Sequence, residues 1–264
     1  MKINWIKFAR RCCERFATKH DSYLDRFYAL RTLGETLLPE YRFKWPQMDW
    51  WGDARFNSYL ARFDETDGMN CDRRWMLHQL LRLVNTVPGD TAECGVFSGS
   101  SSYVICQANA EATVTSKRHH MFDSFEGLSA PKANDGDHWK AGDLSYGVER
   151  VKANLHEFSQ TTAYYPGWIP TRFDDVKDLR FSFVHIDVDL YQPTLDSMSF
   201  FYERINPGGI ILVDDFGFTS CVGATQAVDE VLMNKPEAML RLSGGGGFIV
   251  KGIQTQISPR AAAA

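Results

Sequence analysis

The sequence predicts an α/β protein with a doubly wound, mostly parallel sheet, a C-terminal antiparallel hairpin and an N-terminal helical extension. Segments typical of strands and of helices alternate from residue 72 onward, as in parallel sheets that carry helices on both faces. The runs at residues 181–186 and 210–213 are apolar on both faces, which is typical of strands inside a covered parallel sheet. Glycines at 244–247 lie between two short runs with apolar residues and predict a hairpin turn.

Length and composition suit one α/β domain of ordinary size with an appended helical segment. The chain has 264 residues, of which 44% are apolar, so a substantial core can form. We expect a core domain over residues 71–257, a helical and aromatic segment over 1–70 that serves as a lid or in dimerisation, and a tail over 258–264. The 29 basic and 33 acidic residues give a formal net charge of −4, which offers no electrostatic reason to expect a nucleic acid as partner.

The sequence contains no pattern that predicts a membrane span or a secretion signal. No apolar run is long enough to cross a bilayer, and Lys7, Arg10 and Arg11 interrupt the apolar stretch at the start. We therefore expect a cytoplasmic protein. The six cysteines do not have zinc-site spacing, and we expect buried free thiols.

Residues 3–16 are predicted to form a basic amphipathic helix, because apolar residues recur there at roughly helical spacing beside lysines and arginines. Two interpretations remain open: the helix packs on its own domain or a second subunit, or it anchors at a membrane surface. The apolar face favours a homo-oligomer formed through the N-terminal helices. Residues 41–63 carry Trp45, Trp50 and Trp51 among basic residues; this segment covers a ligand cleft as a lid or only docks on the domain.

The core domain is expected to begin with a helix over residues 72–87, which Asp72 caps and the pair Pro88-Gly89 ends. The polar, turn-rich residues 124–145 predict a long loop beside a cleft. Apolar runs bounded by turn residues predict strands at residues 91–96, 120–122, 161–169, 181–186 and 210–213, and a closing hairpin over 239–252. Further helices are expected from residue 101 and over 147–158, 194–205 and 224–233, with turns at 97–100 and 206–209.

Two of the predicted strands end in pairs of carboxylates. Asp187 and Asp189 follow one buried run, and Asp214 and Asp215 follow the next. Neighbouring parallel strands bring their carboxyl ends to one edge of the sheet, where α/β proteins bind ligands, so we expect up to four carboxylates there. Like charges at close range raise one another's pKa unless a cation neutralises them, so the cluster points to a metal ion or a strong base.

The segment E-C-G-V-F-S-G-S at residues 93–100 predicts a tight turn between a strand and a helix. The spacing of Gly95 and Gly99 departs from the dinucleotide fingerprint G-x-G-x-x-G. Backbone N–H groups at such a turn can hold a carboxylate or a phosphate, and Asp123 at the next strand end can accept hydrogen bonds from two ribose hydroxyls. Glu93 suits a ligand with a positive amino group better than one with a pyrophosphate, which favours S-adenosylmethionine over NAD.

Five segments taken together resemble the macrocin O-methyltransferase family. They are VPGDTAECGVFSGSS, FDSFEGLSAP, PGWIP, HIDVDLYQPT and PGGIILVDDFG, and the resemblance covers roughly residues 72–232. The family consists of S-adenosylmethionine-dependent enzymes that methylate sugar hydroxyls on antibiotics and related products. The resemblance implies a class I methyltransferase fold, which is Rossmann-like, with S-adenosylmethionine and Mg²⁺ as cofactors.

The resemblance also implies roles for individual residues. Asp187, Asp214 and Asp215 match the metal-binding carboxylates of the family, and Asp189 matches a carboxylate that resembles a general base in some members. Other members place a histidine three residues after the first ligand; that position is Leu190 here, so a histidine mechanism is not expected. The implied cofactor-binding residues lie at the glycine turn, the ribose clamp and nearby: Glu93, Gly95, Val96, Phe97, Gly99, Ser100, Asp123, Ser124, Trp168 and Asp187.

We therefore expect a Mg²⁺-dependent O-methyltransferase acting on a hydroxyl of a vicinal diol, in a sugar of a natural product or glycan. An ion bound by three carboxylates can ligate two adjacent hydroxyls and lower the pKa of the reacting one. Asp189, with Asp187 beside it, would then provide the catalytic carboxylates.

Two alternatives remain open: a metal-dependent phosphoester hydrolase, and a non-catalytic partner subunit that keeps the fold. His185 is expected to be a satisfied core histidine, and Asp135, Asp137 and His138 to be solvated loop residues.

Overall fold

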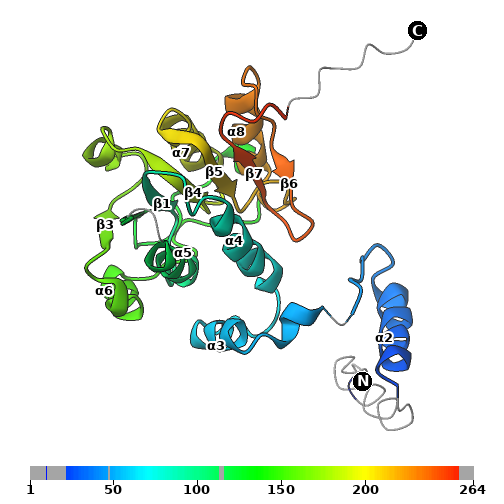
Figure 1. Ribbon diagram of the computed structural model, residues 1–264. Helices are drawn as coiled ribbons and strands as arrows, with labels where there is room; N and C mark the ends of the chain where they lie inside the picture. Colours follow the sequence, from blue (N-terminus) through cyan, green and yellow to red (C-terminus); the bar gives the residue numbers. More distant parts are fainter. Residues whose placement is uncertain (1–9, 11–21, 47, 113–115, 256–264) are drawn as a thin grey trace. The chain divides into compact units, whose positions relative to one another are not determined.

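Seven strands form one sheet in the order β3-β2-β1-β4-β5-β7-β6 (Figure 1). The strands β3, β2, β1, β4 and β5 run parallel, and β7 is antiparallel to β5 and to β6. The prediction of a mostly parallel sheet with a C-terminal antiparallel hairpin is therefore confirmed. The strands are β1 Asp90–Cys94, β2 His119–Asp123, β3 Thr162–Pro166, β4 Phe181–Ile186, β5 Ile205–Val213, β6 Leu240–Arg241 and β7 Gly247–Val250.

The computed structural model describes residue 10 and residues 22–46, 48–112 and 116–255. The chain divides into two units, Met1–Ser58 and Tyr59–Ala264. The helix predicted over residues 3–16 lies outside the described residues, apart from residue 10. Its proposed role in oligomerisation stays a prediction.

The first unit holds helix α2 (Tyr23–Leu37), the 3-10 helix η1 (Asp49–Gly52) and the beginning of α3 (Ala54–Arg62). Aromatic side chains connect its parts. The rings of Phe27 and Trp45 meet edge to face with centroids 6.5 Å apart. At Gly34 a Cβ atom would lie 2.1 Å from the ring of Phe43, so glycine lets that ring pack directly against the backbone of α2.

The second unit begins inside α3, earlier than the boundary that composition predicts. The hydroxyl of Tyr59 donates a hydrogen bond to the main-chain oxygen of Ser100 at 3.1 Å. Its ring stacks on that of Tyr103 with centroids 6.0 Å apart, and Arg62 forms an ion pair with Glu157 at 2.7 Å. These contacts attach the end of α3 to the unit that contains the sheet.

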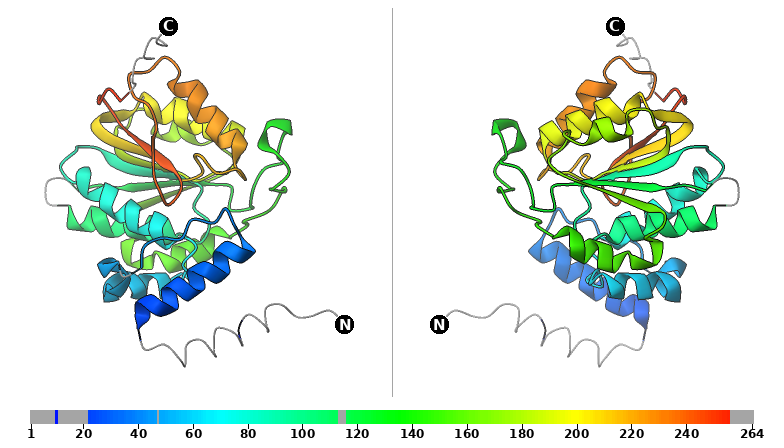
Figure 2. Two further views of the ribbon diagram at one scale, coloured as in Figure 1. Left: turned by 90° about the vertical axis from the view of Figure 1, so that its right-hand side faces the viewer. Right: turned by 90° about the vertical axis from the view of Figure 1, so that its left-hand side faces the viewer.

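Helices cover both faces of the sheet, as a doubly wound fold requires (Figure 2). On one face α4 (Cys71–Leu83) packs on α5 (Ser100–Glu111), and on the other α7 (Tyr191–Tyr202) packs on α8 (Val222–Leu232). The remaining helical segments are α6 (Val148–Asn154) and the 3-10 turns η2 (Ala133–Asp135), η3 (His156–Phe158) and η4 (Phe173–Val176).

The main core lies between the sheet and α7. All six residues of β4 are buried, as the apolar run predicts. Phe201 of α7 packs edge to face on Phe122 of β2 and on Phe181 of β4, with ring centroids 5.9 Å and 5.1 Å apart. Burying one such side chain contributes about 1.5–3 kcal/mol to folding, so this aromatic group anchors the helix on the central strands.

The sheet order reverses between β1 and β4, because β2 and β3 lie on one side of this pair and β5 on the other. At such a reversal the loops leave in opposite directions and open a crevice at the carboxyl ends of the strands. Ile186 of β4 pairs with Cys94 of β1 and with Val213 of β5. The residues that follow these three therefore emerge side by side at one edge.

One predicted turn lies within a strand instead. Residues 206–209 fall inside β5, but the pairing shifts there: Phe181 is opposite Ile205, whereas Phe183 is opposite Ile210. The turn residues thus form an irregularity in the strand, so the prediction of a separate turn is corrected.

No helix among the described residues is long and apolar enough to span a membrane. Cys94, Cys106 and Cys221 are buried free thiols, as predicted, whereas Cys71 is only partly buried. Cys12 and Cys13 lie outside the described part of the chain.

Candidate functional site

The glycine turn after β1 is held against the ends of its neighbouring strands. Gly95 has φ +82°, and a Cβ atom there would lie 1.7 Å from the main-chain oxygen of Asp187. Only glycine therefore permits this approach of β1 to the end of β4. The N–H of Gly95 donates to the oxygen of Phe122, and the N–H of Asp187 donates to the oxygen of Cys94. Gly99, with φ +84°, is the N-cap residue that precedes α5.

The carboxylate of Asp123, at the end of β2, is bound by main-chain N–H groups of the same region. Val96 and Phe97 donate to Oδ2 at 2.6 Å and 3.2 Å, and Phe125 donates to Oδ1 at 2.6 Å. Burial raises the pKa of Asp123, and these hydrogen bonds oppose the rise. The neighbouring Ser124 hydroxyl donates to the oxygen of Gly127 at 2.8 Å, which shapes the start of the following loop.

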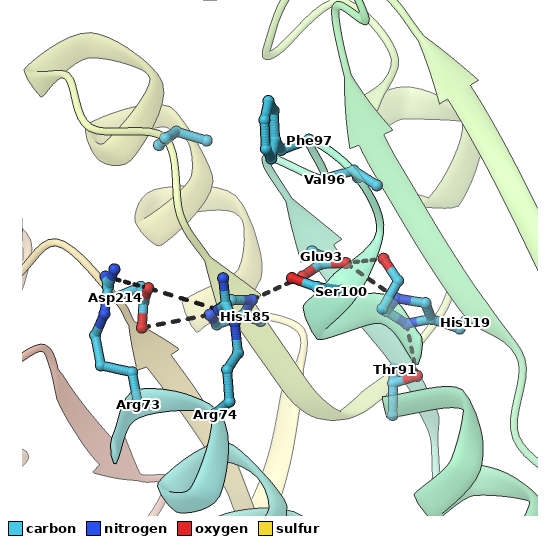
Figure 3. Close-up of polar contacts among 12 residues, drawn as sticks. Arg73, Arg74, Thr91, Glu93, Val96, Phe97, Ser100, His119, His185 and Asp214 are labelled. Atoms are coloured by element: carbon cyan, nitrogen blue, oxygen red, sulfur yellow. Dashed lines mark hydrogen bonds and ion pairs between the residues drawn. The ribbon is translucent and has the colours of Figure 1, made fainter. Parts of the chain in front are cut away.

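Glu93 lies in the sheet interior, next to the turn (Figure 3). It is fully buried. Its Oε1 accepts a hydrogen bond from Nδ1 of His185 at 2.8 Å, and its Oε2 contacts Nε2 of His119 at 3.4 Å and accepts from the hydroxyl of Ser102. Burial alone would raise the pKa of Glu93, but the two histidines hold it well below the usual range.

Glu93 does not belong to the cavity wall described below. Its carboxylate is occupied inside the sheet, so direct contact with a cofactor's amino group does not follow from this arrangement. We therefore revise its expected role from cofactor contact to support of the residues around the site. The reason is physical: a carboxylate one residue before the strand end points into the layer between sheet and helix, where it requires buried partners.

The four predicted carboxylates meet at the edge formed by β4 and β5. They fall into two groups that could each hold a metal ion. Asp187 and Asp214 lie with His185, and Asp189 and Asp215 lie with Cys221; within each group the ligand atoms are within 4.8 Å of one another. The three predicted metal ligands, Asp187, Asp214 and Asp215, are thus divided between two groups.

Two arginines at the start of α4 approach the first group. Nη1 of Arg73 lies 2.5 Å from Oδ2 of Asp214, and Nη1 of Arg74 lies 4.0 Å from the same oxygen. Arg74 also forms an ion pair with Glu65 at 3.1 Å. Burial alone would raise the pKa of Asp214, but His185 and Arg73 hold it well below its usual range.

The other three carboxyl groups have raised pKa values. Burial and the charge of Asp214 raise the pKa of Asp187 to about 6. Burial and the charge of Asp187 raise that of Asp189 to about 7. Burial and the charges of Asp189 and Asp187 raise the pKa of Asp215 well above its usual value. The cluster thus carries more negative charge than its arginines neutralise, and it attracts protons or cations.

The second group is built on a tight turn. Asp189 has φ +59°, an uncommon conformation for a residue with a side chain. Oδ2 of Asp215 stabilises it by accepting hydrogen bonds from the N–H groups of Val188 at 3.0 Å and Asp189 at 2.7 Å. Sγ of Cys221 lies 3.7 Å from Oδ1 of Asp189 and 3.8 Å from Oδ1 of Asp215. The tight turn thus places the side chain of Asp189 close to Asp215, whose carboxylate also accepts a hydrogen bond from the main-chain N–H of Asp189.

The donor atoms at this edge fit a divalent cation. Carboxylate oxygens are the ligands that Mg²⁺ prefers. Both arginines contact Oδ2 of Asp214, whereas Oδ1 faces His185, so one oxygen is open to another partner. Nε2 of His185, on the same side, is buried without a hydrogen-bond partner. An orphaned buried nitrogen beside two carboxylates indicates a place where a positive group is accommodated.

A cavity of about 1040 Å³ lies at this edge of the sheet. Ligand sites are typically about 300–1,000 Å³, so this cavity has room for more than one small molecule. Most of the predicted site residues line it: Gly95, Val96, Phe97, Ser100, Asp123, Ser124, Trp168, Asp187, Asp189 and Asp215. Glu93, Gly99 and Asp214 lie behind or beside this wall and are not among its lining residues.

The predicted loop at residues 124–145 contributes several lining residues, among them His138 and Trp139. Its Asp135 is buried, which corrects the expectation of a solvated residue. Oδ1 of Asp135 accepts a hydrogen bond from the N–H of Tyr191, the first residue of α7, at 2.6 Å. Its Oδ2 accepts from the N–H of Lys132 at 2.7 Å. Asp135 therefore fastens the loop to the helix that follows the carboxylate strand.

Sequence reasoning missed several residues of the site. Arg73, Arg74 and Glu65 precede the first strand, and the contact of Arg73 with Asp214 spans 141 positions. A polar pair at the start of a helix usually faces solvent, so no local pattern distinguishes these arginines. His185 was expected to be satisfied, but only its Nδ1 has a hydrogen-bond partner, and Nε2 lies 3.8 Å from Oδ1 of Asp214.

The sequence pattern of the family described as Macrocin-O-methyltransferase (TylF) matches residues 69–235. One relative is the 8-demethyl-8-(2,3-dimethoxy-alpha-L-rhamnosyl)-tetracenomycin-C 4'-O-methyltransferase of Streptomyces olivaceus. It is 29% identical over 149 residues, which are 53% of this chain and 57% of that protein. Another is the Mycinamicin III 3''-O-methyltransferase of Micromonospora griseorubida, 27% identical over 51% of this chain and 58% of that protein. The matches thus span less than two thirds of these relatives.

Solved structures share the fold. CalS11, a calicheamicin methyltransferase, aligns with a TM-score of 0.62 at 18% identity, over 89% of this chain and 95% of its own. The O-methyltransferase NovP aligns with a TM-score of 0.54 at 24% identity, over 69% of this chain and 80% of its own. The predicted class I methyltransferase fold is therefore confirmed.

Proposed function

This chain belongs to the macrocin O-methyltransferase family, and from that premise we propose that it transfers a methyl group from S-adenosylmethionine to a sugar hydroxyl. One observation carries the proposal: the glycine turn and the strand-end carboxylates line a single cavity. Gly95 and Asp123 lie on the β1 and β2 side, and Asp187 and Asp189 lie at the end of β4. A donor at the turn and an acceptor at the carboxylates would therefore be neighbours.

The turn side of the cavity would hold S-adenosylmethionine. The proposed contacts are Gly95, Val96, Phe97, Gly99, Ser100, Asp123, Ser124, Trp168 and Asp187. When bound, this cofactor supplies the methyl group on a sulfonium. The position of Gly95, Val96, Phe97 and Ser100 in the cavity wall supports the proposal, and Gly99 lies just behind them at the start of α5.

Asp189 is the proposed general base. Its side chain is buried at the cavity wall, and burial together with the charge of Asp187 raises its pKa to about 7. A base with a pKa near neutrality is more effective than an ordinary aspartate at accepting a proton from an alcohol. No histidine stands at the neighbouring position, which is Leu190.

The proposed cation is Mg²⁺, held by Asp187, Asp214 and Asp215. When bound, it polarises hydroxyl oxygens and lowers the pKa of the reacting one, which is why we propose an acceptor with two adjacent hydroxyls. Asp187 belongs to the cavity wall, whereas Asp214 lies behind it. Asp187 would therefore face the acceptor, and Arg73 would fix the orientation of Asp214.

The remaining proposals concern the rest of the chain. We propose that the N-terminal helices form a homo-oligomer and that residues 124–145 help to select the acceptor. The apolar, aromatic composition of α2 and the segment after it supports the first. The contribution of this loop to the cavity wall supports the second.

The direct test is methyl transfer from labelled S-adenosylmethionine to a panel of glycosides with and without adjacent hydroxyls. We expect labelled product only with vicinal diols, and loss of product when EDTA removes divalent ions and return of product when Mg²⁺ is added. Full activity in EDTA would refute the metal requirement, and equal activity on isolated hydroxyls would refute the diol requirement.

A thermal-shift measurement separates this function from phosphoester hydrolysis. Stabilisation by S-adenosylhomocysteine supports a methyltransferase, whereas stabilisation by metal and phosphate alone supports a hydrolase. A protein that binds S-adenosylhomocysteine but methylates nothing in the panel would instead fit a non-catalytic partner subunit.

A further inference from the structure

His185 is a fully buried histidine in a central strand, and one of its ring nitrogens has no hydrogen-bond partner. It is fully buried in β4, two residues before Asp187, so the two side chains leave the strand on the same face. Its Nδ1 is bound to Oε1 of Glu93 at 2.8 Å. Its Nε2 has no hydrogen-bond partner and lies 3.8 Å from Oδ1 of Asp214, too far for a hydrogen bond.

A chain of buried polar contacts fixes the orientation of this imidazole (Figure 3). On the far side of Glu93, Nε2 of His119 contacts Oε2 at 3.4 Å. Nδ1 of His119 lies 3.0 Å from the hydroxyl of Thr91, which also accepts a hydrogen bond from Asn109 at 2.8 Å. Turning the imidazole of His185 would break its hydrogen bond to Glu93, so Nε2 is the nitrogen that faces the carboxylates.

The spacing of the donor atoms suits a shared metal ion. Nε2 of His185 and one oxygen each of Asp187 and Asp214 lie within 4.8 Å of one another. Two ligand atoms that are each about 2.1 Å from an ion are roughly 3.0–4.2 Å apart, depending on the angle at the metal. The 3.8 Å between His185 and Asp214 falls inside that range without any movement.

The charges around this group leave a place for a divalent ion. Three carboxylates surround the imidazole, those of Glu93, Asp187 and Asp214. Arg73 neutralises one of them through Oδ2 of Asp214, while Arg74 is already paired with Glu65. Burial alone would lower the pKa of His185, but Asp214 and Glu93 raise it to about 10, so without an ion its proton balances a second carboxylate. One negative charge still remains in a buried setting, where uncompensated charge is costly.

We propose that Nε2 of His185 is a direct ligand of the divalent cation, together with Asp187 and Oδ1 of Asp214, and that Glu93 is the carboxylate that orients it. A histidine that ligates a metal commonly donates its other N–H to a carboxylate, and this is the relation between His185 and Glu93. The inference rests on the cation site of the proposed function and deepens it. It adds a nitrogen to a site that the sequence predicts from carboxylates alone.

The nitrogen ligand changes which cation the site prefers. Imidazole binds Co²⁺, Ni²⁺ and Zn²⁺ well, whereas Mg²⁺ favours oxygen ligands only. The site should therefore bind a borderline transition-metal ion more tightly than Mg²⁺. Metal binding requires a neutral imidazole, so the ion competes with the proton that Asp214 and Glu93 attract to His185.

Pulsed EPR of the full chain loaded with Mn²⁺ tests the ligation directly and does not depend on turnover. A bound imidazole gives a ¹⁴N coupling in the electron spin echo of Mn²⁺, and carboxylates give none. We expect this coupling in the wild type and its loss in His185→Gln. Bound Mn²⁺ without a ¹⁴N coupling in the wild type would overturn the inference, even if His185→Gln fails to fold, while leaving the metal requirement of the proposed function intact.

Calorimetry with Co²⁺ and with Mg²⁺ tests the selectivity. We expect Glu93→Gln to weaken Co²⁺ binding by about 10–100-fold, the usual effect of losing the partner that orients a ligand. His185→Gln should weaken it at least as much, and both variants should weaken Mg²⁺ binding much less. The matched control is His120→Gln, a buried imidazole on β2 whose partners are Asp90 and Tyr165; it should keep both the ¹⁴N coupling and the Co²⁺ affinity. Equal losses for both ions in His185→Gln would contradict a nitrogen ligand.

Discussion

Arg73 forms an ion pair with Asp214 at 2.5 Å, which connects the first turn of α4 to the end of β5. Asp214 is buried, and a buried carboxylate without a partner is strongly destabilising. The pair therefore serves the fold as well as the site, since it lets a carboxylate stay ionised behind the cavity wall.

We expect Arg73→Gln to lower the free energy of unfolding by about 2–4 kcal/mol, because removing one partner of a buried pair leaves the other charge uncompensated. Urea denaturation measures the loss, and the double variant Arg73→Gln/Asp214→Asn should recover part of it. Arg82→Gln is the control, because this arginine lies on the exposed side of the same helix and its loss should cost less than about 0.5 kcal/mol. Equal effects of the two arginine variants would rule out a special role for Arg73.

Gly95→Ala should prevent stable folding, because the new Cβ would overlap the main-chain oxygen of Asp187 in addition to the strain of a positive φ. Gly142→Ala separates these two effects. Gly142 has φ +84° and nothing within 4 Å of a Cβ atom, so we expect only the backbone strain of about 1–3 kcal/mol. Thermal unfolding by circular dichroism compares the variants, and a similar melting temperature for both would show that the strands do not approach this closely.

Asp189→Asn should lower kcat by about 10²–10⁴-fold, the usual contribution of a general base, while the affinity for S-adenosylhomocysteine changes little. Single-turnover kinetics and calorimetry measure the two quantities separately. The control is Asp137→Asn, an exposed carboxylate of the neighbouring loop, which should leave both unchanged. A kcat for Asp189→Asn within a factor of three of wild type would assign the base to another group.

Asp135→Ala should loosen the loop over residues 124–145, because its carboxylate accepts the hydrogen bonds that hold Lys132 and Tyr191. Hydrogen exchange followed by mass spectrometry should show faster exchange in this loop and at the start of α7, with the rest of the sheet unchanged. In kinetics the KM for the acceptor should rise more than the KM for S-adenosylmethionine. Unchanged exchange in the loop would mean that other contacts fasten it.

Lys117 predicts a pH dependence of stability at alkaline pH. Its side chain is buried and donates to the oxygen of Val84 at 2.9 Å and to Ser182 at 2.8 Å. Burial lowers its pKa to about 8, against 10.5 in the unfolded chain. Between these values the unfolded state binds more protons than the folded state, so the free energy of unfolding rises with pH.

The expected slope from Lys117 is at most about 1.4 kcal/mol per pH unit between pH 8 and 10.5. Urea denaturation of wild type and Lys117→Met across this range measures it, with the exposed Lys140→Met as control. The wild type should gain stability relative to Lys117→Met as the pH rises, and it should show no such gain relative to Lys140→Met. If the wild type lost stability relative to Lys117→Met over this range, the pKa of Lys117 would not be lower in the folded chain than in the unfolded chain.

Much of the fold follows from local patterns. Strand β4 has both faces covered, so its run of apolar residues identifies it without any knowledge of its neighbours. The carboxylates after β4 and β5 follow from the same reasoning, because parallel strands end at a common edge. The bulge at residues 206–209 does not follow, because it depends on how β5 pairs with β4.

It is harder to predict from the sequence what each side chain contacts than to predict which residues lie near the site. Glu93 and Asp123 both stand near a strand end, yet Glu93 is enclosed by two histidines and Asp123 reaches the cavity. A shift of one residue along a strand moves a side chain from one face of the sheet to the other. Which residues contact the side chains on each face is decided only when the sheet packs against α5.

The sequence by itself determined the class of fold, the edge of the sheet where the carboxylates meet and the residue types gathered there, because periodicity and strand-end position are local properties of the chain. Only the tertiary structure decided which carboxylates are neutralised by arginines, which are left with raised pKa values, and that one nitrogen of His185 is aimed at Asp187 and Asp214. Those outcomes depend on side chains that are far apart in the chain and come together only when α4 and β1 pack beside β4 and β5.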